Sequence, residues 1–186
     1  MSYTENRQII LQEITHALEE VPEADVVLLT DVLCNAERIF AVGVGRVLLM
    51  LQAFVKRLNH LGLRATYVGA IDEPAITEHD VLLVGSSSGE SVFPLSIVRL
   101  AKKYGAKIVH IGANPTSSMA EYEDVFIRLR CRTKFYLPDE IVSKQPMSSL
   151  FEQSLLLLLD SVAMNIIERQ EITDLHTLWK YHANLE

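Results

Sequence analysis

The sequence lacks the features that mark several large classes of protein. Its two cysteines, Cys34 and Cys131, are far apart and form no CxxC pair, so we expect two reduced structural thiols rather than a disulfide or a metal site. None of its six histidines stands in an HxxxH or HExxH spacing, and we predict no metal site. No repeat, low-complexity tract or linker interrupts the 186 residues, which suffice for one domain with a sizeable core.

Clustered positive charge and long apolar runs are also missing. The chain carries 17 Lys and Arg against 24 Asp and Glu, a net charge of −7, and it has no basic block. Nucleic acid is therefore not expected as its main partner. Residues 1–7 lack the apolar core of a signal peptide, and the longest leucine run, at 155–159, is too short to span a bilayer. We expect a soluble cytoplasmic protein with no membrane partner.

Short apolar runs alternate with helical patterns along most of the chain. Apolar residues recur at helical spacing between Ile9 and Val21, and these predict an N-terminal helix. Further helices are predicted at 24–35, 47–60, 92–104 and 147–169, and strands at 38–42, 65–68, 81–84, 107–111 and 124–127.

The predicted strands are apolar throughout rather than alternating, which indicates a parallel sheet covered on both faces. We therefore predict a three-layer α/β/α sandwich with a five-stranded parallel sheet, flavodoxin-like in plan. A single domain, 1–186, would comprise N-terminal helices in 1–36, the α/β core in 37–170 and a helical tail in 171–186. Ligands of such sheets bind beyond the carboxyl ends of the strands, near a switch in strand order, so the loops after Val42 and Val84 are the expected site.

A loop of small hydroxyl residues follows the third predicted strand and opens a helix. Its members are Ser86, Ser87, Ser88, Gly89 and Ser91. Free N–H groups and the positive end of a helix dipole suit a phosphate, serine hydroxyls add donors, and glycine permits close approach. No lysine follows the glycine, which excludes a Walker A loop and favours a small phosphorylated molecule. The alternative is a serine-rich turn that merely caps the helix.

Two further segments carry candidate residues. In the first strand-to-helix loop, Gly43 and Gly45 either admit a ligand or only form a tight turn, because Leu48 replaces the third glycine of a dinucleotide-binding loop. Arg46 either contacts an anionic ligand or is solvated. Glu152 lies in the first turn of the last long helix, as a dipole-stabilising carboxylate or as a general base.

Residues 84–91 resemble the second phosphate loop of the sugar isomerase (SIS) family. Segments 57–62, 145–152 and 182–186 resemble, more narrowly, the 6-phospho-3-hexuloisomerase branch of that family. The resemblance covers nearly the whole chain. It implies an isomerase, without metal or redox cofactor, that interconverts 6-phospho-3-hexulose and fructose 6-phosphate through an enediol. The alternative is a non-catalytic module that binds a phosphosugar.

The resemblance also implies roles for particular residues. Glu152 would be the base, and His60 and His182 would handle hydroxyl protons, unless either histidine is only structural. The phosphate would be held by the hydroxyls of Ser86, Ser88 and Ser91 and by the backbone of Ser87 and Gly89.

One departure from the family pattern concerns the first loop. The family continues this loop as Gly-Arg-Ser-Gly, whereas Val47 and Leu48 follow Arg46 here. The family's ligand-binding hydroxyl is therefore absent. In the second loop, Ser87 replaces a usual glycine and Ser91 a usual threonine, and both changes keep the polarity.

Apolar residues in the N-terminal helix and in the tail exceed what one sheet needs to cover it. The tail contributes Leu175, Leu178 and Trp179. Family members generally build their sites between subunits, so we expect a homotetramer in which His60 or His182 reaches a neighbour's site. In the alternative, both segments fold back onto their own domain. The sequence leaves the sugar phosphate itself open.

Overall fold

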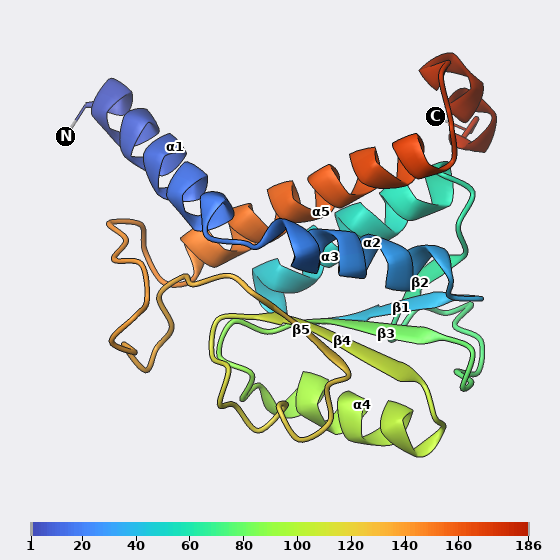
Figure 1. The fold of residues 1–186 in the computed structure, drawn as a ribbon, viewed down its shortest axis with the longest axis horizontal. Helices are drawn as coiled ribbons and strands as arrows, with labels where there is room; N and C mark the ends of the chain where they lie inside the picture. Colours follow the sequence, from blue (N-terminus) through green and yellow to red (C-terminus); the bar gives the residue numbers. More distant parts are fainter. Residues whose placement is uncertain (1, 186) are drawn as a thin grey trace.

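The computed structural model describes residues 2–185, and its centre is a five-stranded parallel sheet (Figure 1). The strand order is β2-β1-β3-β4-β5, and every neighbouring pair is parallel. This confirms the predicted sheet. The chain moves outward from β1 to β2 on one side and from β3 to β4 on the other, so the order reverses between β1 and β3. The strands are β1 Ile39–Val42, β2 Ala65–Tyr67, β3 Val81–Gly85, β4 Lys107–Gly112 and β5 Val125–Arg128.

The two faces of the sheet are covered unequally. Four helices, α1, α2, α3 and α5, lie on one face, and α4 lies on the other (Figure 1). The connections after β2 and β4 contain turns but no helix, and Ile76, Met119 and Tyr122 from these loops pack on the face of α4. The predicted three layers are thus confirmed, with unequal outer layers. The helices are α1 Tyr3–Glu19, α2 Glu23–Cys34, α3 Gly45–His60, α4 Val92–Lys103, α5 Ser149–Arg169 and the 3₁₀ helix η1 Leu175–Tyr181.

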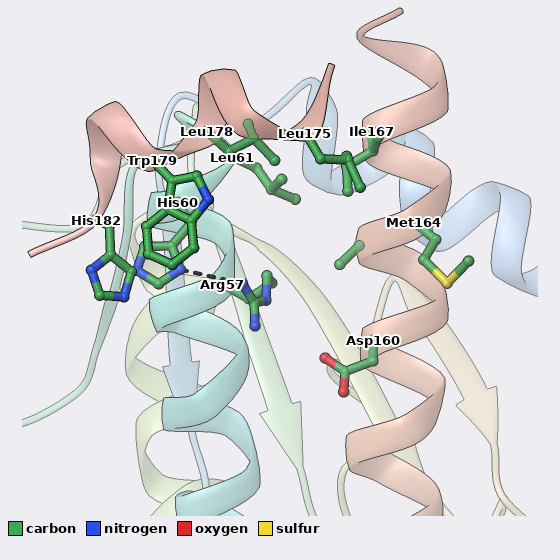
Figure 2. Close-up of a pocket in the computed structure, with 11 residues that line it drawn as sticks. Arg57, His60, Leu61, Asp160, Met164, Ile167, Leu175, Leu178, Trp179 and His182 are labelled. Atoms are coloured by element: carbon green, nitrogen blue, oxygen red, sulfur yellow. Dashed lines mark hydrogen bonds between the residues drawn. The ribbon is translucent and has the colours of Figure 1, made fainter. Parts of the chain in front are cut away.

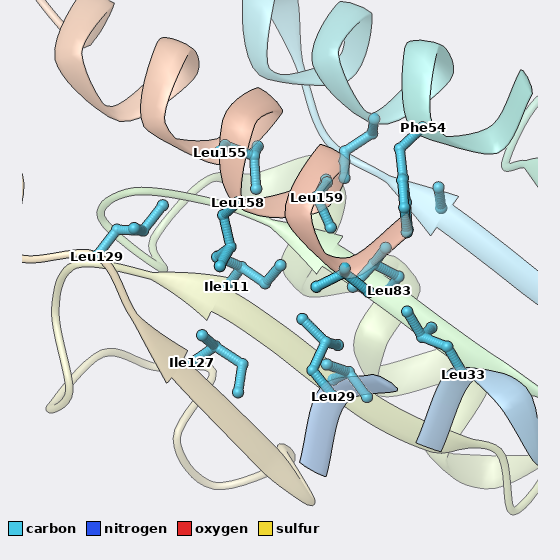
Figure 3. Close-up of a cluster of buried hydrophobic side chains, with 14 of the residues drawn as sticks. Leu29, Leu33, Phe54, Leu83, Ile111, Ile127, Leu129, Leu155, Leu158 and Leu159 are labelled. Carbon is cyan, nitrogen blue, oxygen red and sulfur yellow. The ribbon is translucent and has the colours of Figure 1, made fainter. Parts of the chain in front are cut away.

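The larger core lies between the sheet and the four-helix layer. Figure 3 shows Leu83, Ile111 and Ile127 from the sheet facing leucines of α2 and α5. By length and composition α5 would suffice to cross a membrane. Ten of its residues are buried, however, so its apolar character serves this core.

Local backbone geometry explains where two helices begin. Met147 has φ +51°, a left-handed conformation that interrupts a right-handed helix, and α5 begins at Ser149 rather than at the predicted residue 147. In α3 the helix begins at Gly45, two residues before the prediction. The other predicted helices end within two residues of the observed ones.

Candidate functional site

The strand order brings the two predicted loops together. β1 and β3 are neighbours in register, with Val42 opposite Val84. The first loop, residues 43–48, and the serine loop, residues 86–91, therefore leave the same edge of the sheet at the point where the strand order reverses. In open parallel sheets this is where ligands bind.

Three helices begin near these loops without a side-chain cap. The N-cap residues are Val44 for α3, Ser91 for α4 and Ser148 for α5, and none of them makes a side-chain capping hydrogen bond. By contrast, Ser2 and Glu5 form a complete capping box on α1. Ser91 thus occupies a capping position without capping. The first N–H groups of uncapped helices remain able to bind an anion.

Hydrogen bonds within the serine loop leave hydroxyl protons available. The Gly89 N–H donates to the carbonyl and to the hydroxyl oxygen of Ser86, both at 3.2 Å. The Ser88 hydroxyl oxygen accepts from the Glu90 N–H at 3.3 Å. Because these hydroxyls act as acceptors, their own protons can still be donated to a ligand. The Ser87 Oγ is buried and has no hydrogen-bond partner within residues 2–185.

The segment after β4 supports the serine loop from beneath. The Ser87 carbonyl accepts from the N–H groups of Ala113, at 2.9 Å, and Asn114, at 3.3 Å. Gly89 has φ +67°, and a Cβ there would lie 2.2 Å from the Ser117 Oγ. Only glycine fits this position, both for its backbone conformation and for its contact with Ser117.

One residue beneath the loop was missed by sequence reasoning. His110, in β4, is fully buried. Its Nε2 lies 3.0 Å from the Ser86 carbonyl oxygen, and its Nδ1 lies 2.7 Å from Oε2 of Glu123. A single histidine in an apolar strand is indistinguishable from an ordinary core residue. The signal that could have found it is the strand register, which pairs His110 with Val84, two residues before Ser86.

The first loop is shaped by packing instead. A Cβ on Gly43 would lie 3.0 Å from Cδ1 of Leu51 and 3.3 Å from the Gly85 carbonyl oxygen, so glycine is needed for close approach. Gly45 is open to space but has φ +57°, so it serves the turn. Val47 packs over Gly85, where a Cβ would lie 2.8 Å from its Cγ1. The apolar side chain of Val47 thus stands where the family resemblance implies a serine hydroxyl.

Glu152 and Arg46 meet at the beginnings of α5 and α3. The Arg46 Nε donates to Oε2 of Glu152 in a short ion pair. The Glu152 residue is 7% exposed, whereas the Arg46 side chain is 61% exposed. The structure therefore places both predicted residues together, with a buried carboxylate behind a solvent-facing guanidinium. A carboxylate can accept a proton and a guanidinium can bind an anion, which are the two functions predicted for this edge.

Glu13 of α1 fixes the segment that leads into α5. Its carboxylate accepts from the Ser143 hydroxyl at 2.6 Å, the Lys144 N–H at 2.8 Å and the Gln145 side chain at 3.0 Å. Burial of Glu13 favours a raised pKa, but these hydrogen bonds outweigh it and hold the pKa below its usual value. Gln145 belongs to the same sequence motif as Glu152, and its side chain is held by Glu13 in a structural contact.

The two predicted histidines lie together, at the other end of α3. The rings of His60 and His182 stack with their centroids 5.1 Å apart, and Trp179 of the tail lies 5.0 Å from His182. They border a pocket of about 600 Å³ between α3, α5 and η1 (Figure 2). Since the 16 residues of α3 span about 24 Å, a single chain does not bring these histidines to Glu152. Their catalytic role stays a prediction.

The tail packs on its own chain. Leu178 joins the larger core, and the Tyr181 ring lies against Gly62. Trp179 nevertheless remains 63% exposed. Within one chain, the tail therefore folds back onto its own domain. The assembly of several chains into a homotetramer stays a prediction.

The cysteines and the potential metal ligands within the described part of the chain form no additional cluster. Both cysteines are free, and burial raises the pKa of the Cys131 thiol to about 12. Across residues 2–185, no three His, Cys, Asp or Glu side chains come together in a way that could hold a metal ion.

The fold and this edge of the sheet define the class of the protein. The chain belongs to the SIS domain family, whose sequence model matches residues 32–161. It is 34% identical to 3-hexulose-6-phosphate isomerase of Bacillus subtilis (strain 168), over 100% of both chains. It is 32% identical to the enzyme of the same name from Mycobacterium gastri, over 98% of this chain and 91% of that one.

A solved structure agrees with these relatives. A hypothetical protein from Methanococcus jannaschii, with an inferred function of 3-hexulose-6-phosphate isomerase, superimposes with a TM-score of 0.84 at 28% identity. The match covers 98% of this chain and 99% of that chain. The family resemblance predicted from the sequence is confirmed.

Proposed function

We propose that this protein is a sugar-phosphate isomerase that interconverts 3-hexulose 6-phosphate and fructose 6-phosphate. The observation that carries the proposal is the position of the buried Glu152 carboxylate, in the first turn of α5, next to two loops that begin uncapped helices. The relatives named 3-hexulose-6-phosphate isomerase support the choice of substrate.

The serine loop is the proposed phosphate site. Ser86, Ser88 and Ser91 supply hydroxyl protons, and the beginning of α4 supplies backbone N–H groups. The tightly supported Gly89 keeps the loop in one shape, so little conformational freedom is lost when the ligand binds. Arg46 is exposed at the mouth of the site and adds a positive charge.

Glu152 is the proposed base. It removes the proton from carbon 2 of the hexulose, which gives the deprotonated enediol (an enediolate) across carbons 2 and 3. The proton then returns to carbon 3, while a hydroxyl proton moves from the oxygen of carbon 2 to that of carbon 3. The carbonyl thereby moves from carbon 3 to carbon 2 with atoms and electrons balanced. A single carboxylate can serve both carbons if it lies within hydrogen-bond reach of them.

The test is turnover of 3-hexulose 6-phosphate, followed by the appearance of fructose 6-phosphate. We expect Glu152→Gln to lower kcat by about a hundredfold or more, because the amide cannot accept the proton. The control is Glu168→Gln, which makes the same change at an exposed position on the same helix. Equal kcat values in the two variants would refute the role of Glu152, and an inactive wild type would refute the isomerase.

A non-catalytic phosphosugar-binding module is the second candidate. It is favoured by the pairing of Arg46 with Glu152, which engages the carboxylate, and by the absence of a hydroxyl at Val47. Calorimetry with fructose 6-phosphate separates the two candidates. Saturable binding by a protein without turnover would support the module, whereas turnover excludes it.

We further propose that the site is completed by a second subunit, within a homotetramer. Exposed apolar residues surround the loops at the beginnings of the three uncapped helices: Val44 (42% exposed), Val92 (80%), Phe93 (49%) and Met147 (96%). Covering such a rim with another chain would bury apolar area and could bring a neighbour's His60 or His182 to the sugar. A monomer in light scattering at assay concentration would contradict the proposal.

A further inference from the structure

Beneath the serine loop, His110 makes contacts that the proposed chemistry does not use. The side chain is completely buried, and both ring nitrogens have polar partners. One partner is the Ser86 carbonyl, which also accepts the Gly89 N–H that closes the loop. His110 therefore contacts the loop at the group on which its turn depends.

The partners determine where the protons lie. A carbonyl oxygen only accepts, so the Nε2 of His110 must carry the proton that it donates to Ser86. On the other side of the ring, the Nδ1 lies 2.7 Å from Oε2 of the Glu123 carboxylate. The contacts at both nitrogens hold the ring in one orientation.

The surroundings fit an imidazole closely. Gly112 has no side chain where a Cβ would lie 2.5 Å from the His110 Nε2. Phe126 packs against the ring with the centroids 5.2 Å apart. A hydrogen-bonded ring in such a packed position transmits the geometry of β4 directly to the loop above it.

We propose that His110, oriented by Glu123, is a positioning residue that sets the shape of the serine loop for phosphate binding. The Nε2–H holds the Ser86 carbonyl, and this carbonyl holds Gly89 and the loop hydroxyls in register. His110 does not touch the substrate. The kinetic part of this inference rests on the proposed function, whereas the structural part does not.

Two amide substitutions separate the contacts of the two ring nitrogens. In His110→Gln the side-chain nitrogen can reach the position of Nε2, and in His110→Asn that of Nδ1. We expect Gln to retain the donor to Ser86 and to stay close to the wild-type KM. We expect Asn to lose this donor and to raise KM about tenfold, with kcat changed much less. Both variants place an uncharged amide at the same buried position, and the deciding readout is a rise in KM with kcat little changed, which lost packing alone does not produce.

Hydrogen exchange at the Gly89 amide supplies a readout that needs no activity. The amide should exchange faster in His110→Asn than in His110→Gln, since only the former frees the Ser86 carbonyl. If His110→Asn does not fold, Glu123→Ala takes its place and should also accelerate exchange at Gly89, because the ring loses its orienting partner. Equal exchange and equal KM in the compared variants would overturn the inference. An inactive wild type would refute the proposed function alone, and exchange at Gly89 would still decide the role of His110.

Discussion

The serine loop and the first loop follow neighbouring strands and begin helices in the same way, yet different forces hold them. Polar contacts fix the serine loop: the carbonyls of Ser86 and Ser87 accept hydrogen bonds from β4 and the segment that follows it. Apolar contacts fix the first loop, where Val47 packs on Gly85 and Gly43 approaches Leu51.

This difference shows how the two loops can divide one task. A loop held from beneath by its carbonyls presents its N–H and hydroxyl groups outward, which suits an anion. In a loop held by packing, only a side chain that does not pack is accessible to a ligand. In the first loop this side chain is Arg46, which is paired with Glu152. We infer that the serine loop binds the phosphate, and that the first loop contributes through Arg46 rather than through its backbone.

The largest effect is expected from alanine at the glycine with positive φ in each of the two loops. Gly89→Ala adds a Cβ that meets Ser117 and also strains the backbone, so we expect a loss of about 3 kcal/mol in the free energy of unfolding. Gly45→Ala adds a Cβ in open space and should cost only about 1 kcal/mol. Urea denaturation measures both losses.

Ligand affinity provides a second comparison of the same two variants. Gly89→Ala should abolish saturable binding of fructose 6-phosphate in calorimetry, and Gly45→Ala should weaken it only slightly. Similar losses of affinity in both variants would mean that the first loop contributes as much to phosphate binding as the serine loop does.

A moderate effect is expected at position 47, where the family has a serine. Val47→Ser should lower the KM for the hexulose phosphate by about threefold to tenfold, because a hydroxyl joins the site. The lost packing over Gly85 should reduce the free energy of unfolding by about 1 kcal/mol. Val47→Ala is the matched control, since it loses similar packing without gaining a hydroxyl. If KM falls equally in both variants, the improved affinity comes from the smaller side chain and not from a new hydrogen bond.

The smallest effect concerns the outer end of the serine loop. The Ser118 hydroxyl and then the Ser118 N–H, each 2.7 Å from a Glu90 carboxylate oxygen, hold the pKa of Glu90 below its ordinary value of 4.5. Because the folded-state pKa is lowered, this stabilisation is present above pH 4.5 and is lost as the pH falls through the lowered value.

Glu90→Gln should therefore lower Tm by about 2 °C or less at pH 7. The difference from wild type should close in acid, as measured by thermal melts from pH 7 to pH 3. A difference that does not shrink as the pH falls would show that the carboxylate charge is not responsible.

Much of the fold could be predicted because each strand is a short apolar run and most are followed by a helical pattern. Two details depended on geometry beyond local pattern. The left-handed backbone at Met147 delays α5, and the helix-free connections after β2 and β4 leave α4 alone on its face. The division of the chain at residues 36 and 170 and the cytoplasmic location stay predictions.

The site could be predicted where one loop carries it, and less where distant segments meet. The serine loop and Glu152 were candidates by residue type and position, and the structure brings Glu152 to Arg46 across 106 positions of sequence. His110 could not be found this way, because its role depends on strand register and on Glu123, in a loop. His60 and His182 were separate candidates from the resemblance, and their stacking on each other was not predicted. Their action at Glu152 from a neighbouring chain stays a prediction.

The packing of α1 on α5 has a consequence for biosynthesis. Helix α1 packs on α5, and α5 follows every strand of the sheet in the sequence. Until α5 has been made, α1 lacks the helix on which it packs, and the part of the sheet that faces the leucines of α5 (Figure 3) is not covered by α2 and α3 alone. The nascent chain thus exposes part of its larger core until α5 has been made, the condition under which chaperones bind and truncated products aggregate.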